Sequence, residues 1–351
     1  MKIFSIVGAR PQFIKLAPLS KLLSQSHEEI IVHTGQHYDY QMSEGIFKDL
    51  GIRPPDIHLE AGHNGPTAQI TEMMLKLEEA MITGQPELVI VFGDTNSTIA
   101  AALIAAKLCI PIIHVEAGLR SYNRNMPEEV NRIVTDHLSK YLFAPTNTAF
   151  DILKKEGLAE NSYLTGDIMV DTISDNRKIA LEKSNIIAEL SLEKNNYSVL
   201  TLHRNYNVDH PEVLSHLLSE IAKLDEPTIF PVHPRTKSRL TETYSVSKNI
   251  RMIEPLGYLD FICLQSFAKR IITDSGGIQK EAYILKKPCI TLRTETEWAE
   301  TVEERWNLLI DPGRNTFHEE IASFEVPEYQ ANIFGENVTE KMVEIINGIG
   351  R

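Results

Sequence analysis

The sequence predicts an α/β protein made of two doubly wound domains in tandem, and three observations carry this prediction. Short apolar, β-branched segments alternate with helical patterns along most of the 351 residues, which is the order typical of parallel α/β folds. The strand segments are nearly continuous apolar runs, which indicates sheets covered by helices on both faces. The chain is also too long for one ordinary core, and its alternation pauses near residues 166–171 before it resumes.

The elements follow from the apolar pattern in chain order. In the first series we expect strands at 2–8, 29–35, 87–94, 110–118 and 140–146, and helices at 13–26, 68–84, 97–108 and 128–139. A long polar helical segment follows the pause and is expected to reach about Asn196. In the second series we expect strands at 197–203, 227–233, 250–255, 270–277 and 287–293, again separated by helices.

The pause sets the expected domain boundary. We place the first Rossmann-like domain at 1–168 and the second at 169–332. The last segment, 333–351, is a lone amphipathic helix, and by analogy with other two-domain folds we expect it to pack back on the first domain. Ligands of open α/β sheets bind beyond the carboxyl ends of the strands, so polar residues at those ends are the candidates for function.

Composition excludes several classes of protein. The formal net charge of −13 argues against a nucleic-acid binder or a binder of anionic membranes. The longest apolar stretch, Ile99 to Val115, is interrupted by Lys107 and Pro111, so no membrane span is expected. The cysteines Cys109, Cys263 and Cys289 have neither zinc-site nor disulfide spacing. We therefore expect buried free thiols and no metal site. The apolar run at the first residues is too short for a signal peptide, so we expect a cytoplasmic location.

The first strand leads into GARPQFIKLAP, a short loop that opens a helix. This segment is neither a dinucleotide-binding G-x-G-x-x-G motif nor a Walker A loop. The second strand ends at His33 without an acidic residue to hold a ribose, so an NAD-dependent enzyme is disfavoured and no cofactor is expected. Arg10 and Lys15 at the helix start could bind phosphate, although an isolated pair of this kind is equally often a surface salt bridge.

Carboxylates follow two further strands of the first series. Asp94 comes directly after LVIVFG, Glu116 follows PIIHV, and Glu128 lies at the start of the next helix. Acids at successive strand ends of one sheet are expected to converge on the same crevice, and Asp and Glu are rarely buried without a partner. For Glu128 alone, interaction with the helix dipole is an equal alternative.

In the second series, cationic residues and glycines, rather than carboxylates, follow the predicted strands. His203 and Arg204 follow one strand and His233 follows another, which favours an anion site more strongly than a lone histidine would. The segment TDSGGIQKEA places Ser275, Gly276 and Gly277 between a strand and a helix. Glycines there would let backbone N–H groups approach phosphate oxygens, and the helix dipole favours negative charge, although a simple N-cap explains such a turn as well.

Taken in order, nine segments resemble the non-hydrolysing UDP-N-acetylglucosamine 2-epimerase family. The similarity runs from residue 1 to about 312 and rests on GARPQFIKLAP, TGQHYD, VFGDTNST, HVEAGLRS, MPEEVNR, TLHR, FPVHPRT, LGYLDF and TDSGGIQKEA. The resemblance implies a GT-B-like fold in which two Rossmann-like domains face a central cleft. It also implies catalysis without NAD or metal, a UDP-sugar substrate and a homodimer.

The resemblance further implies roles for single residues. Those matching the catalytic set are Asp94, Glu116, Glu128 and His203. Those matching diphosphate contacts are Arg10, Ser275, Gly276 and Gly277, while Glu281 matches a ribose-binding acid and Phe261 lies in the segment that meets uracil. Polar residues matching the cleft lining are Lys15, Gln36 and His37. Arg204, His233 and Arg293 complete the expected substrate-binding set.

The implied reaction interconverts UDP-GlcNAc and UDP-ManNAc. UDP is eliminated to give a 2-acetamidoglucal and is then added back, which needs an acid, a base and donors on the departing diphosphate. The product would serve the synthesis of cell-surface polysaccharide precursors. Domain closure is expected to assemble the site and shield the glycal from water.

Two departures from the commonest bacterial pattern leave alternatives open. Met73 stands where many members have an arginine that helps bind an activating UDP-N-acetylglucosamine. The segment TLRTETEWAETVEERWN resembles a subgroup that also includes epimerases of UDP-2,3-diacetamido-2,3-dideoxy-glucuronate, and Arg235, Arg293 and Arg314 are spare cations that could meet a C6 carboxylate. A hydrolysing epimerase, a GT-B glycosyltransferase and a non-catalytic sugar-nucleotide sensor are the further alternatives. GARPQ differs from the GTRP-like start of the hydrolysing relatives.

Overall fold

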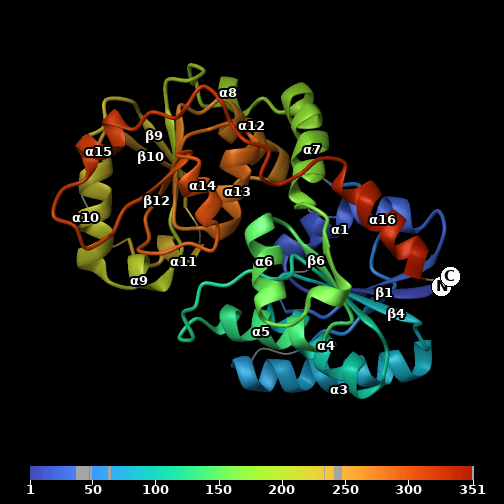
Figure 1. Cartoon of the computed structure of the whole chain (residues 1–351). Coiled ribbons are helices and arrows are strands. Elements are labelled where there is room, and N and C mark those ends of the chain that lie inside the picture. Colours follow the sequence, from blue (N-terminus) through green and yellow to red (C-terminus); the bar gives the residue numbers. More distant parts are fainter. Residues whose placement is uncertain (37–46, 48–49, 62–64, 233, 241–246, 350–351) are drawn as a thin grey trace. The chain divides into compact units, whose positions relative to one another are not determined.

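The structure is a computed structural model that describes the chain except for residues 37–46, 48–49, 62–64, 233, 241–246 and 350–351 (Figure 1). The chain divides into two compact units. The first comprises Met1–Thr172 with Asn332–Arg351, and the second comprises Ile173–Ala331. Each unit has its own sheet, and all strand pairs between described residues run parallel. The predicted α/β class with two Rossmann-like sheets is therefore confirmed.

The sheet of the first unit has seven strands in the order β3-β2-β1-β4-β5-β6-β7. Their bounds are β1 Lys2–Val7, β2 Glu28–His33, β3 Ile57–His58, β4 Leu88–Phe92, β5 Ile112–Val115, β6 Tyr141–Ala144 and β7 Ser162–Leu164. The chain moves outward in one direction from β1 and then in the other direction from β4. The point between β1 and β4 is thus the topological switch, where doubly wound folds bind their ligands.

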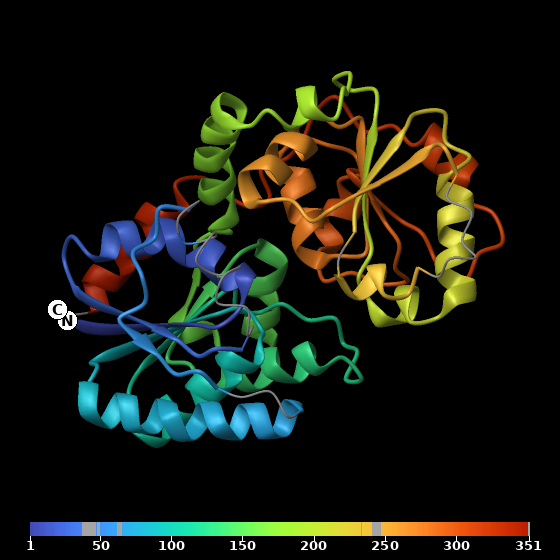
Figure 2. The same cartoon turned by 180° about the vertical axis from the view of Figure 1, so that it is seen from behind.

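Helices cover both faces of this sheet. Their bounds are α1 Arg10–Leu23, α3 Pro66–Gly84, α4 Asn96–Lys107, α5 Pro127–Leu138, α6 Asn147–Lys155 and α16 Val338–Ile349, with a short 3₁₀ turn at Ala159–Asn161. Alternate residues of a strand face opposite sides. Ile3 and Val7 of β1 therefore pack in one core with residues of α1 and α16, whereas Phe4 and Ile6 pack in another with residues of α3 and α4. Figures 1 and 2 show these two helix pairs on opposite sides of the sheet.

The sheet of the second unit has six strands in the order β10-β9-β8-β11-β12-β13. Their bounds are β8 Ser198–Thr201, β9 Thr228–Pro231, β10 Ile250–Ile253, β11 Arg270–Thr273, β12 Cys289–Thr291 and β13 Asn307–Leu309. Here the switch point lies between β8 and β11. α7, Met169–Lys183, begins in the first unit and continues into the second. The other helices of the second unit are α8 Ile186–Glu189, α9 Asn205–Val208, α10 Pro211–Ile221, α11 Pro234–Lys237, α12 Tyr258–Ser266, α13 Gly276–Ile284, α14 Ala299–Glu303 and α15 His318–Ser323. α10 and α15 share one apolar core with the sheet, and α13 packs on its other face.

Two expectations from the sequence were wrong, and the structure adds three short strands that were not predicted. The helix predicted to reach Asn196 is two helices, because α7 ends at Lys183 and Ser184 turns its hydroxyl to Asp260 Oδ1 at 2.6 Å. The edge strands β3, β7 and β13 escaped prediction because they have only two or three residues each. Cys109 is exposed rather than buried, whereas the other two cysteines are buried. In the part of the chain that the structure describes, no helix is both long and apolar enough to cross a membrane.

Candidate active site

The predicted residues of the first unit lie at the carboxyl ends of β1, β2, β4 and β5 or on the helices that follow. Arg10 is the first residue of α1 and is partly exposed. Gln36 follows β2, and its Oε1 accepts from the backbone N–H of Ser97 at 2.9 Å and from the Ser97 hydroxyl at 2.7 Å, both at the start of α4. Glu128 lies in the first turn of α5 and is partly exposed. His37 lies outside the described residues.

Lys15 and Glu116 form a buried ion pair across 101 residues of sequence. Each side chain is only 9% exposed, and Glu116 adopts a left-handed backbone conformation with φ of 74° directly after β5. Such a conformation costs about 1 kcal/mol or more for a residue that is not glycine, so it persists only where its surroundings enforce it. Gly93 packs against the pair, because a Cβ atom on it would lie 3.2 Å from both Glu116 Oε2 and Lys15 Nζ. The loop after β4 therefore has to remain small beside this pair.

Asp94 is held by two residues of α5 that the sequence analysis did not single out. Arg132 Nη1 donates to Asp94 Oδ2 at 2.6 Å, and Asn131 Nδ2 donates to the Asp94 carbonyl oxygen at 2.8 Å. Arg132 also donates to Glu129 Oε2 at 2.7 Å. Spacing within MPEEVNR could have suggested this pairing, because residues three apart on a helix face one another.

Glu129, not Glu128, is the buried acid of the α5 start. Its carboxylate accepts from the backbone N–H groups of Ser121 at 2.9 Å and Tyr122 at 2.8 Å, so it anchors the loop between β5 and α5. Burial by itself would raise the pKa of Glu129. Hydrogen bonds from Ser121, Arg132 and Tyr122, together with the charge of Arg132, outweigh burial and hold that pKa below its ordinary value.

In the second unit, Asp274 organises the predicted cations. It follows β11, its side chain is fully buried, and it accepts from the backbone N–H groups of His203 at 3.0 Å and Arg204 at 2.9 Å. His203 Nδ1 also lies 2.9 Å from Asp274 Oδ1. Burial alone would raise the pKa of Asp274, but the hydrogen bond and charge of His203, followed by the N–H groups of Arg204 and Asn207, hold it below its ordinary value. His233 lies outside the described residues.

The two glycines before α13 differ in their surroundings. Ser275 is the N-cap residue and its side chain makes no cap hydrogen bond. A Cβ atom on Gly276 would lie 2.2 Å from Glu297 Oε1, whereas a Cβ atom on Gly277 would meet only Ser275 Oγ at 3.9 Å. A side chain at position 276 would therefore have to displace a carboxylate of the protein itself, a constraint that the sequence pattern does not reveal. Gly277 leaves the helix N-terminus accessible on its exposed side.

Glu297 belongs to a buried ion pair with Arg293. Arg293 Nη1 lies 3.0 Å from Glu297 Oε2, and the arginine side chain is only 2% exposed. Its guanidinium nitrogens make no hydrogen bond to any other described residue. In this conformation Arg293 is paired inside the protein rather than exposed for contact with a ligand.

Two further predicted residues lie on the neighbouring helices α12 and α13. Glu281 is buried on α13 and accepts from Gln265 Nε2 at 2.8 Å. Phe261 lies on α12 and is partly exposed. Both therefore lie in the second unit, together with His203, Arg204 and Ser275.

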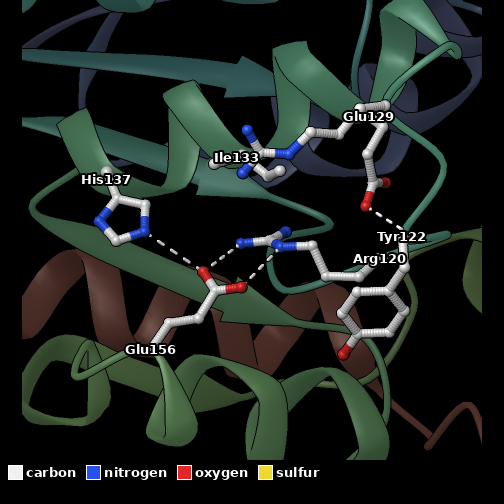
Figure 3. A pocket seen from close by; sticks show the side chains of 7 residues that line it. Arg120, Tyr122, Glu129, Ile133, His137 and Glu156 are labelled. Carbon is white, nitrogen blue, oxygen red and sulfur yellow. Dashed lines mark hydrogen bonds and ion pairs between the residues drawn. The ribbon is translucent and has the colours of Figure 1, made fainter.

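A pocket of about 320 Å³ opens in the first unit beside α5 (Figure 3). Its lining includes Arg120, Tyr122, Glu129, His137 and Glu156. Glu156 accepts from Arg120 Nε at 2.9 Å and Nη2 at 2.7 Å, and His137 Nε2 lies 3.3 Å from Glu156 Oε2. None of these residues was predicted, and their charges largely neutralise one another.

The chain is similar in sequence to a family of known enzymes. A family model described as UDP-N-acetylglucosamine 2-epimerase matches residues 21–347. A UDP-N-acetylglucosamine 2-epimerase homolog of Methanococcus maripaludis is 48% identical over 358 residues, covering 99% of this chain and 100% of the relative. The UDP-2,3-diacetamido-2,3-dideoxy-D-glucuronate 2-epimerase of Pseudomonas aeruginosa is 43% identical over 324 residues, covering 90% of each chain.

A solved structure agrees with this assignment. The Methanocaldococcus jannaschii UDP-GlcNAc 2-epimerase, in complex with UDP-GlcNAc and UDP, superposes with a TM-score of 0.90 and 40% identity, covering 99% of this chain and 100% of that one. The fold and these relatives define a nucleotide-sugar isomerase with two Rossmann-like domains. More particularly, the chain belongs to the non-hydrolysing UDP-N-acetylglucosamine 2-epimerase family.

Proposed function

We propose that this protein interconverts UDP-N-acetylglucosamine and UDP-N-acetylmannosamine by eliminating UDP and adding it back. The observation that carries the proposal is the pair of carboxylates after neighbouring strands β4 and β5. Asp94 is bound by Arg132, and Glu116 is paired with Lys15 in a buried setting. Two carboxylates held in place beside cations can take up or return a proton at a sugar carbon.

The proposed chemistry balances within the substrate. One carboxylate accepts the C2 proton, the C–H electrons form a C1–C2 double bond, and the C1–O electrons leave with UDP. In the return step a proton is delivered to the opposite face of C2, and a UDP oxygen bonds to C1. Asp94, Glu116 and Glu128 are the acids that we propose for these transfers, with their roles exchanged between the two directions.

The second unit supplies the proposed diphosphate site. The exposed side of Gly277 at the α13 N-terminus, the Ser275 hydroxyl and the loop of His203 and Arg204 surround the switch point between β8 and β11. N–H groups and positive charge at such a point stabilise the negative charge that develops on a departing diphosphate. Within the same proposal, Glu281 binds the ribose and Arg10 contacts the diphosphate.

A second substrate is supported by a specific similarity. A relative that is 43% identical is an epimerase of UDP-2,3-diacetamido-2,3-dideoxy-D-glucuronate. This substrate differs from UDP-N-acetylglucosamine at C3 and C6, away from the bonds that change, so the same carboxylates would serve. We take it as the alternative substrate for the same chemistry.

Met73 bears on regulation in the proposed enzyme. Its side chain is fully buried in the core between α3, α4 and the sheet, and Ser97 Oγ lies 3.9 Å from its sulfur. At this position many members of the family have an arginine that can contact an activating nucleotide sugar, whereas Met73 packs in the core. We expect turnover without a second UDP-N-acetylglucosamine, which hyperbolic rather than sigmoidal kinetics would show.

Assembly and cellular role form part of the same proposal. We propose a cytoplasmic homodimer that supplies precursors of cell-surface polysaccharide, as the resemblance to this family implies. Light scattering coupled to size exclusion would give twice the chain mass of 39.7 kDa for a dimer.

The decisive test follows both substrates in deuterated water. The purified chain is incubated with each UDP-sugar and the products are resolved by ¹H NMR. We expect gluco and manno forms to equilibrate with deuterium at C2 of the product. Equilibration without deuterium at C2 would contradict the elimination mechanism, and release of free N-acetylmannosamine would indicate hydrolysis instead. Nucleotide binding without turnover would indicate a sensor, and the ratio of rates decides between the substrates.

A further inference from the structure

Both ring nitrogens of His114 lie beside oxygen atoms, and a neutral imidazole cannot donate a hydrogen bond to both of them. His114 lies in β5, two residues before Glu116, and its side chain has no exposed surface. Its Nδ1 lies 2.6 Å from Asp136 Oδ1, and its Nε2 lies 2.7 Å from the carbonyl oxygen of Gly93. Both distances are those of hydrogen bonds.

Both neighbours of this imidazole can only accept. A backbone carbonyl has no proton to give, and the Asp136 carboxylate already forms an ion pair with Arg120 Nη1 at 2.7 Å and accepts from the Gly118 N–H at 3.0 Å. A neutral imidazole carries one N–H, so one of its nitrogens would face an oxygen lone pair at hydrogen-bond distance. Only the doubly protonated ring can donate in both directions.

The charge of Asp136 is consistent with this account. Burial would raise the pKa of Asp136, but the charge and hydrogen bond of His114, followed by those of Arg120, hold it below its ordinary value. Arg120 is itself paired with Glu156. With a doubly protonated His114, two cations, His114 and Arg120, alternate with two carboxylates, Asp136 and Glu156. At the partly exposed end of this series, Glu156 also lies 3.3 Å from His137 Nε2. Pairing of this kind offsets the cost of burying each charge.

We propose that His114 is a buried imidazolium that positions the two loops carrying Asp94 and Glu116. Its Nε2–H holds the carbonyl of Gly93, the residue before Asp94. Asp136, bound to its Nδ1–H, holds the N–H of Gly118, two residues after Glu116. His114 is a positioning residue and touches no reacting atom. Its importance for turnover rests on the proposed function of Asp94 and Glu116, whereas its protonation state does not.

Solid-state ¹⁵N NMR on the full chain, labelled at the histidine ring nitrogens, tests the protonation state directly. The chain has 12 histidines, so the His114 signals are identified by difference from the spectrum of His114→Asn. At pH 7.5 we expect both ring nitrogens of His114 to carry a proton. A signal from a ring nitrogen without a proton overturns the proposal.

Asp136→Asn provides a matched change of charge without a change of shape. The Asn oxygen can accept from Arg120 and Gly118, and its amide can donate to Nδ1, which would leave His114 neutral while Nε2–H still donates to Gly93. We expect one ring nitrogen to lose its proton in this variant. A doubly protonated ring in Asp136→Asn would show that Asp136 does not set the charge, and the proposal would fail.

Kinetics test the positioning role separately. In His114→Asn the donor to the Gly93 carbonyl is lost, so kcat should fall about tenfold or more while KM stays within about threefold. Asp136→Asn keeps that donor and should retain more of kcat than His114→Asn does. His210→Asn, an exposed histidine beside Glu212 at 3.7 Å, is the control and should match the parent. An unchanged kcat in His114→Asn refutes positioning. If the parent chain turns over neither UDP-sugar, the proposed function fails while the NMR result still decides the charge.

Discussion

The Oε1 atom of Glu297 lies 2.2 Å from the place that a Cβ atom of residue 276 would occupy. Gly276→Ala must therefore displace a buried carboxylate that is paired with Arg293. We expect a loss of about 1–3 kcal/mol in the free energy of unfolding, typical of overpacking a buried site. Urea denaturation of the variant and the parent measures it.

Gly277→Ala is the matched control for this prediction. Its Cβ atom would make only an ordinary van der Waals contact with Ser275 Oγ at 3.9 Å, and Gly277 lies in a helix with an ordinary backbone φ, so stability should be unchanged or higher by up to about 1 kcal/mol. Glu297→Asp shortens the carboxylate side chain and keeps its charge. In that background Gly276→Ala should cost less, and an equal cost in both backgrounds would refute the steric account.

The Lys15–Glu116 pair predicts a loss of both stability and turnover when the ammonium is removed. Lys15→Met deprives a buried carboxylate of its paired cation, so we expect unfolding to become easier by about 3–5 kcal/mol. The same change should lower kcat/KM by about a hundredfold, because the carboxylate moves from its place after β5. Steady-state kinetics and denaturation measure the two effects.

Lys21 offers a control on the same helix. It is exposed in the last turn of α1, so Lys21→Met should leave both quantities close to those of the parent. In a double-mutant cycle, Lys15→Met should cost much less stability in a Glu116→Gln background. Additive losses would show that the two side chains do not depend on each other.

Asp274 predicts a contribution to stability that depends on pH. Its pKa is held below the ordinary value, so its contribution is complete above the unfolded-state pKa of about 3.9 and is lost as pH falls through the folded-state pKa. Asp274→Asn should lower the free energy of unfolding by about 2–4 kcal/mol at pH 7 and reduce its decline in acid. Urea titrations between pH 7 and about pH 3 give both quantities. An equally steep decline in the variant would mean that other carboxylates cause it.

The three cysteines should differ sharply in reactivity. Burial raises the pKa of the Cys289 thiol to about 12, and burial also raises that of Cys263, whereas Cys109 is exposed. The thiolate is the reactive form of cysteine. In the native chain we therefore expect one cysteine to react with a chromogenic disulfide reagent, and we expect the other two to react only after the chain is unfolded. Cys109→Ser should abolish the fast reaction, and a persistent fast phase would contradict the assignment.

The sequence predicted the sheet class and the long strands because their apolar runs are continuous and their helices are strongly periodic. It could not predict β3, β7 or β13, which are too short to carry a pattern and exist only because a neighbouring strand pairs with them. At the break after Lys183, the Ser184 hydroxyl donates to Asp260, which is 76 residues away along the chain. Contacts of that separation leave no local signal.

Some residues of the candidate site could also be predicted from the sequence, whereas their partners could not. Asp94 and Glu116 could be chosen because they follow apolar strands, but the cations that hold them come from α1 and α5. Arg132 and Asp274 were missed because a charged residue beside a motif looks like any other until its partner is known. Gly276 was chosen because a glycine would let backbone N–H groups approach a phosphate. In the structure, the atom that crowds a side chain at this position is Oε1 of Glu297.

The return of the chain to its first unit has a consequence for synthesis. Val338, Met342 and Ile346 of α16 belong to the same apolar core as Ile3 and Val7 of β1. The second unit is one continuous stretch, 173–331, and can complete its core as soon as it has left the ribosome. The unit that is translated first must wait for the last helix. The two units should therefore finish folding in the reverse of the translated order, and the incomplete N-terminal sheet is the part that chaperones would have to protect in the meantime.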